Sequence, residues 1–244
     1  MMKSRSYTHC MLLVLALLAA CDSGDIGEKT YFPNNSGQTV KLTATLTGAA
    51  TWNDNYSVAL AGFRDGSNYA VMQHALPAST PDGTRVEVIL SNLTGQVGTV
   101  EFAITNRLRE RIVTLERITL ADYAASQDTI RMDLGTVDVS VFGCLQQGIL
   151  NQACIQCHGG NGRMAGGLDL TPGNAYGNLV DVRSTLTDML RIKSGNADAS
   201  LVWKILNEGG ENTIGYNHTE VLSSQFKDNL EEVKNLIREW INGL

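Results

Sequence analysis

The spacing of apolar residues changes near residue 140 of this chain of 244 residues. Before that point apolar residues alternate with polar ones, as in Thr39–Leu46, which is typical of strands with one buried face. Turn-forming residues such as Asp65-Gly66 and Asp82-Gly83 separate some of these runs, and counting the alternating stretches predicts about seven short strands. After that point apolar residues recur at Leu145, Ile149 and Ala153, which predicts a helix with Ser140 as its N-cap.

These patterns predict two separate domains. Residues 37–140 are expected to form an antiparallel, immunoglobulin-like β-sandwich, because short strands at this density pair into two packed sheets. Residues 141–244 are expected to be all-α, since they begin with the helix just described and end with another amphipathic one. The apolar stripe of that last helix includes Val233, Ile237 and Ile241.

Residues 1–20 are typical of an export signal, because two basic residues precede an apolar run too short to span a bilayer. The run ends in Leu18–Cys21 (LAAC), which resembles the lipobox of bacterial lipoproteins. This resemblance implies that Cys21 is diacylated and begins the mature chain, although a coincidental cysteine after an ordinary cleavage site is the alternative. Residues 21–36 are then a tether. We expect a protein that is lipid-anchored to a bacterial membrane in the cell envelope and faces the periplasm or the exterior.

The charge of the chain limits its partners. It has 19 Lys and Arg against 25 Asp and Glu, a formal net charge of −6, and two of the basic residues belong to the predicted signal. An acidic protein is repelled by a phosphate backbone, so we expect no nucleic-acid partner. The expected membrane contact is therefore the N-terminal lipid and not a basic patch.

Residues 154–158 read Cys-Ile-Gln-Cys-His, which is the C-x-x-C-H spacing of covalent haem attachment. On a helix, Cys154, Cys157 and His158 lie at positions i, i+3 and i+4, and therefore on one face. Two thiols at this spacing can form thioether bonds to the vinyl groups of one porphyrin, and His158 then faces the iron as an axial ligand. The motif predicts one covalent haem c.

Two other uses of these side chains stay open. A zinc site could combine Cys154, Cys157 and His218, although the sequence has no second C-x-x-C or H-x-x-x-H pair. A dithiol redox pair of the thioredoxin type would need a strand followed by a helix, which residues 147–153 do not predict.

Residues 141–244 resemble the class I cytochrome c domain, and more narrowly the single-haem domains of exported bacterial proteins. The resemblance rests on residues 154–160 (CIQCHGG), 166–170 (GGLDL), 175–176 (AY) followed by 179–180 (LV), 194–206 (SGNADASLVWKIL) and 237–241 (IREWI). It implies an all-α fold with one haem and a distal iron ligand in the loop before the last helix.

The family usually places a Met in that loop, but residues 212–224 contain none. His218 occupies roughly the matching place, so the resemblance implies His218 as the second iron ligand. Met189, Met164 or an open iron face are the alternatives. Two imidazole ligands should give a lower reduction potential than imidazole with a thioether. Arg191 matches an Arg of related domains and would pair with a haem propionate.

These expectations predict a membrane-anchored cytochrome that transfers single electrons between redox partner proteins, with no catalytic residues of its own. An acidic surface would suit a basic partner. One alternative is a haem-containing subunit of an envelope redox enzyme, such as a peroxidase-like one, which would need an open iron face. Another is a β-sandwich binding module in which the haem is accessory.

Overall fold

The structure is a computed structural model that describes residues 37–123, 129–160 and 162–244. The predicted signal, the tether and the lipidated Cys21 lie outside these residues. All described residues belong to one compact unit. Among them, no helix is both long and apolar enough to cross a membrane.

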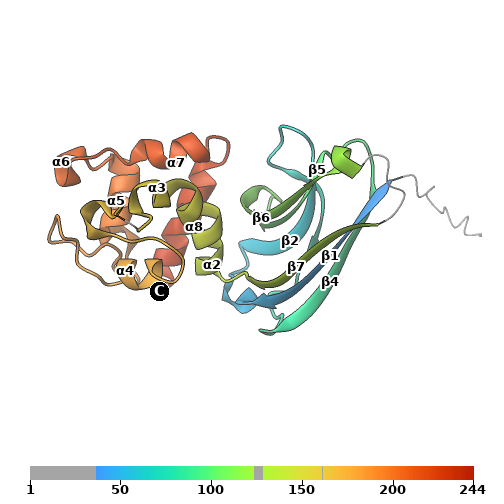
Figure 1. Ribbon diagram of the computed structural model, residues 1–244, viewed down its shortest axis with the longest axis horizontal. Helices are drawn as coiled ribbons and strands as arrows, with labels where there is room; N and C mark the ends of the chain where they lie inside the picture. Colours follow the sequence, from blue (N-terminus) through green and yellow to red (C-terminus); the bar gives the residue numbers. More distant parts are fainter. Residues whose placement is uncertain (1–36, 124–128, 161) are drawn as a thin grey trace, which may run out of the picture. The chain divides into compact units, whose positions relative to one another are not determined.

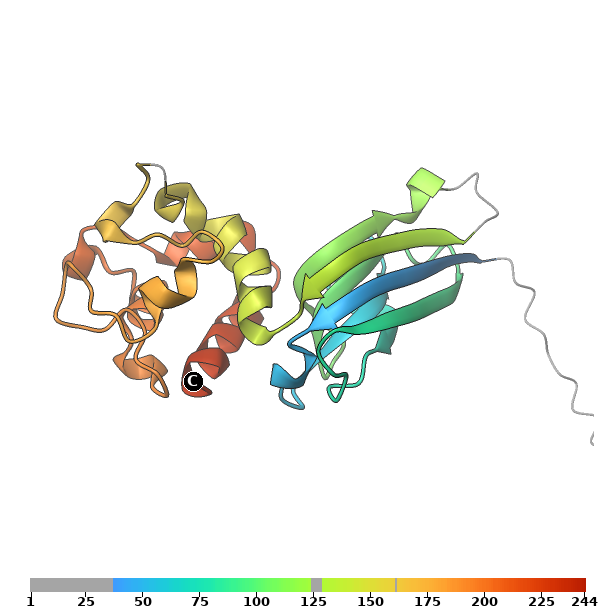
Figure 2. The same ribbon diagram turned by 60° about the horizontal axis from the view of Figure 1, so that its bottom comes forward.

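Strands in two sheets form the part that precedes residue 140 (Figure 1, Figure 2). Sheet A contains, in spatial order, β4 (Thr84–Leu93), β1 (Gln38–Thr47) and β7 (Ile130–Asp138). Sheet B contains, in spatial order, β3 (Ala70–Ala75), β2 (Tyr56–Phe63), β5 (Thr99–Asn106) and β6 (Arg111–Thr119). The short 3-10 helices are η1 (Ala49–Thr51) and η2 (Leu120–Tyr123).

The predicted alternation of β1 is confirmed. Val40, Leu42 and Leu46 are fully buried, and they belong to one apolar cluster with Phe102 of sheet B. The intervening Lys41 projects from the other face of sheet A, where it pairs with Glu87 at 2.9 Å. Burial of the alternate apolar side chains between the sheets therefore sets the register of the strand.

The predicted antiparallel sandwich is wrong in its topology. β1 pairs antiparallel with β4, with Leu42 opposite Val88, but it pairs parallel with β7, with Leu42 opposite Met132. The chain leaves sheet B after β6 and enters sheet A beside β1 in the same direction, so sheet A is mixed. Alternation reports only which face of a strand is buried and not which neighbour it pairs with.

Short helices dominate the chain after residue 140 (Figure 1). They are α2 (Val141–Leu145), the π-helix η3 (Gln146–Cys154), α3 (Ile155–His158), α4 (Ala175–Leu179), α5 (Leu201–Glu208), α6 (Glu211–Ile214), α7 (Thr219–Gln225) and α8 (Leu230–Asn242), with 3-10 turns η4 (Ala165–Gly167) and η5 (Ala197–Ala199). Ser140 caps α2 as predicted, since its Oγ accepts a hydrogen bond from the Gly143 N–H at 3.0 Å.

The expected all-α class I cytochrome c domain is also wrong. The described structure is mostly β, with seven strands in two sheets, and its helical part is small. Most of its helices are shorter than the roughly 12 residues that an isolated helix needs, so packing against other elements has to stabilise them. The apolar cluster accordingly continues from the sheets into η3, α7 and α8, and Asn229 Nδ2 donates to the Ile112 carbonyl of β6 at 3.1 Å.

Candidate functional site

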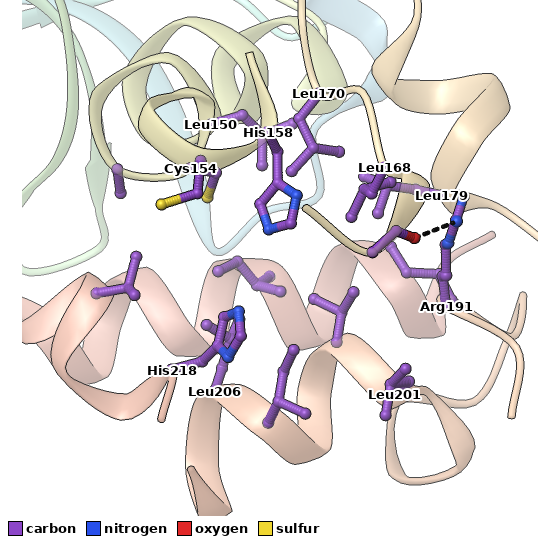
Figure 3. A pocket seen from close by; sticks show the side chains of 18 of the residues that line it. Leu150, Cys154, His158, Leu168, Leu170, Leu179, Arg191, Leu201, Leu206 and His218 are labelled. Carbon is purple, nitrogen blue, oxygen red and sulfur yellow. Dashed lines mark hydrogen bonds between the residues drawn. The ribbon is translucent and has the colours of Figure 1, made fainter. Parts of the chain in front are cut away.

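An apolar cavity of about 310 Å³ lies among the helices that surround α3 (Figure 3). Leucine and isoleucine side chains from η3, α5, α7 and α8 form most of its wall, for example Ile149, Leu206, Leu222 and Ile237. A mostly apolar cavity with a few converging polar groups is typical of a small-molecule or cofactor site. The polar or titratable groups on this wall include those named from the sequence: Cys154, Cys157, His158, Arg191 and His218.

The C-x-x-C-H motif spans the end of η3 and the whole of α3. Its three side chains line the cavity as predicted from helical spacing. Cys154 is half-buried, Cys157 is exposed, and both are free thiols. Burial, with a smaller contribution from Cys157, raises the pKa of Cys154 to about 12. Such a thiol is neutral near pH 7, unlike the low-pKa cysteine of a dithiol oxidoreductase.

His158 and His218 face each other across the cavity (Figure 3). Their ring centroids are 6.5 Å apart and their planes differ by 22°. A metal ion bonded to both rings at about 2 Å from each ligating nitrogen would need ring centres roughly 6 Å apart. The observed spacing therefore fits one metal ion between the two imidazoles.

The surroundings of His218 leave one of its nitrogens free. His218 stands at the N-terminus of α7, where its Nδ1 lies 3.2 Å from the Tyr216 carbonyl oxygen. The Tyr216 ring also packs edge-on against it at 5.0 Å. When Nδ1 donates to that carbonyl, Nε2 keeps its lone pair for a metal, as is usual for metal-ligating histidines. Sequence reasoning missed Tyr216, because no pattern marks a carbonyl acceptor.

The environment of His158 favours the neutral form of its ring. Desolvation lowers its pKa, and the nearby His218 acts in the same direction. The backbone at Leu168 and Ala165 acts to raise this pKa. The buried Nδ1 forms no hydrogen bond of ordinary geometry with any described residue. A neutral imidazole is the form that binds metals.

Arg191 is a buried cation on the cavity wall, with 6% of its surface exposed. Its guanidinium donates to the backbone carbonyls of Asn178 at 2.9 Å and of Gly167 at 3.3 Å. Gly167 has a φ of 65°, a backbone conformation that glycine adopts without strain. Within the described residues Arg191 forms no ion pair with a carboxylate. Desolvation lowers its pKa, and an anionic group of a bound molecule would supply the missing negative charge.

The alternative ligands lie elsewhere. Met164 is 50% exposed, and neither it nor Met189 is among the described residues that line the cavity. His74 lies on β3 of the sandwich. Across the described ranges, no three His, Cys, Asp or Glu side chains are close enough together to hold a metal ion. A structural zinc site takes four protein ligands, so the zinc hypothesis finds no support.

Comparison of the chain with protein-family models, curated protein sequences and solved structures finds no match. The chemistry of the site is therefore argued from its own residues. Two facing imidazoles, two adjacent thiols and one unpaired guanidinium meet at a single apolar cavity.

Proposed function

We propose that this protein is a lipid-anchored c-type cytochrome that binds one haem covalently and passes single electrons between redox partner proteins of the bacterial envelope. The observation that carries the proposal is the pair of facing imidazoles, His158 and His218, beside the C-x-x-C-H thiols. The residues fit a haem on three counts: the spacing of the rings, the apolar wall of the cavity, and the unpaired Arg191.

Each residue then has a separate task. Cys154 and Cys157 would hold the porphyrin through thioether bonds, and His158 and His218 would hold the iron from opposite faces. Arg191 would pair with a propionate, and the leucine and isoleucine wall would exclude water. When bound, the haem supplies a one-electron couple, Fe(III)/Fe(II).

The site favours an electron carrier over an enzyme. A peroxidase-like subunit needs one open face of the iron where a substrate binds. Here each face of the cavity carries an imidazole, and the 6.5 Å between the ring centroids leaves room for a metal ion but not for an additional ligand. The proposed reaction is therefore outer-sphere electron exchange with a partner protein.

Haem attachment is tested by expressing the full chain in a host that matures c-type cytochromes. We expect the denatured, acid-acetone-washed protein to keep its pigment and to be heavier by one haem than the processed, lipid-modified polypeptide. Cys154→Ala or Cys157→Ala should prevent stable two-point attachment. Cys144→Ala is the matched control, because this buried cysteine is not among the described residues on the cavity wall. A mass of the processed, lipid-modified polypeptide without haem would refute the proposal for the parent protein.

The anchor and the partners belong to the same proposal. Diacylation of Cys21 would hold the protein at a bacterial membrane, on the periplasmic or the exterior side. We expect Cys21→Ser to release the protein from the membrane fraction, while the pigment stays attached. An unchanged distribution between membrane and soluble fractions would count against the lipid anchor. Because the chain is acidic, a basic redox partner is expected, with association that weakens as salt rises.

A further inference from the structure

Gln146, the first residue of η3, is a buried polar side chain that packing does not explain. It is 7% exposed. Its Nε2 donates to the Asn151 Oδ1 at 2.8 Å and to the Leu170 carbonyl at 2.9 Å. Its Oε1 is buried and accepts no hydrogen bond within the described residues. An unsatisfied buried acceptor destabilises a fold, so a glutamine at this place calls for a role other than stability.

The hydrogen bonds of Gln146 lead to the haem-binding motif. The Leu170 carbonyl accepts from Gln146, and the Leu170 N–H donates to the His158 carbonyl at 2.7 Å. Leu168 and Leu170 both line the cavity, and Figure 3 shows their side chains beside the His158 ring. One side chain on η3 thus connects residues 168–170 to the backbone of His158.

The π-helical geometry of η3 makes this connection possible. Gln146 and Asn151 are five residues apart, and in an α-helix such residues point about 140° apart around the axis. In a π-helix, with its i→i+5 repeat, they share one face. The Asn151 Oδ1 therefore accepts a hydrogen bond from one N–H of the Gln146 amide, and the other N–H donates to the Leu170 carbonyl.

We propose that Gln146 is a positioning residue, which holds residues 168–170 against the motif and so sets the orientation of the His158 ring. The inference rests on the proposed function, because the ring is oriented for the iron. An amide is required, since Nε2 faces two acceptor oxygens and a carboxylate in its place would be repelled by both.

The test replaces Gln146 with methionine in the full-length holoprotein. Methionine keeps the length of the side chain but loses both hydrogen bonds and the unsatisfied oxygen. Because the buried Leu170 carbonyl then lacks its donor, the thermal unfolding of the variant is measured as well, and the g-values separate loss of positioning from loss of stability. We expect the Leu170 amide to exchange its hydrogen up to about tenfold faster. We also expect the g-values of the ferric haem in electron paramagnetic resonance to shift, because they report the orientation of the axial ring. Asn151→Ala, at a half-buried position, should produce a smaller change of the same kind.

Gln147→Met is the matched control. Within the described residues its side chain makes a single hydrogen bond, to the Asp138 carbonyl at 3.5 Å, and both observables should stay at their parent values. Parent-like g-values together with parent-like exchange at Leu170 in Gln146→Met would overturn the inference. If the parent chain carries no haem, the proposed function fails, and the exchange rate of Leu170 alone still decides whether Gln146 holds this segment.

Discussion

If the protein binds haem as proposed, replacing His218 with alanine should open one face of the iron. His158 would remain as the single imidazole ligand, because the Met164 and Met189 side chains are not on the described cavity wall. The ferric spectrum should change from low-spin to high-spin, and cyanide and carbon monoxide should bind rapidly. His74→Ala is the matched control, since His74 is exposed on β3 and should leave both properties unchanged.

The contribution of the His218 ligand to the midpoint potential can be estimated with His218→Met, which places a thioether ligand at the same position. Axial ligands tune haem potentials over about 0.8 V, so exchanging imidazole for thioether should raise the midpoint by on the order of 0.1 V. At about 59 mV per tenfold change, this is roughly a 50-fold shift of the ferric–ferrous equilibrium, or about 2.3 kcal/mol. Potentiometric titration of the purified protein measures it.

One outcome would refute this reasoning. If His218→Ala kept a low-spin spectrum, bound cyanide no faster than the parent and kept the parent midpoint, His218 would not be the ligand. The facing arrangement of the two rings would then have a purely structural origin.

Three further predictions concern the cavity and its supports. Arg191→Met removes a buried positive charge from the cavity wall, so the midpoint potential should fall by roughly 65–130 mV, the equivalent of about 1.5–3 kcal/mol for a charge-assisted hydrogen bond. Gly148→Ala places a Cβ 2.2 Å from the Val113 Cγ1 and should destabilise the fold by about 1–3 kcal/mol in thermal unfolding, partly restored by Val113→Ala. In haem-free protein, the raised pKa of Cys154 leaves little thiolate near pH 7, so iodoacetamide should alkylate it at least about tenfold more slowly than Cys157, and the difference should shrink as pH rises toward 12.

Each of these has a result that would contradict it. A parent-like potential in Arg191→Met, or an equal change in the exposed Arg163→Met, would separate Arg191 from the haem. A Gly148→Ala protein as stable as the parent would mean that η3 and β6 can move apart without cost. Equal alkylation of the two motif cysteines at pH 7 would show that Cys154 is not desolvated.

Local features of this protein could be predicted from the sequence. The alternation in β1, the N-cap at Ser140, and the burial of Leu145, Ile149 and Ala153 depend on neighbours a few residues away. The common face of the C-x-x-C-H side chains is equally local, since helical spacing alone places them together.

Other features depend on partners far away in the chain. The hydrogen bond from Gln146 on η3 to the Leu170 carbonyl is one example, because its two partners are 24 residues apart in the sequence. The surroundings of Arg191 are another example. Its guanidinium is held by the carbonyls of Asn178 and Gly167, which belong to other segments of the chain. Neither has a signal in the local pattern of residues.

The sequence by itself determined the strand-rich and helical parts and the candidate haem-attachment motif, because periodicity and spacing are properties of adjacent residues. Only the tertiary structure decided that β7 runs parallel to β1 and that His218 faces His158. Strand pairing and the meeting of distant side chains follow from the burial of apolar surface over the whole chain, which no single segment encodes.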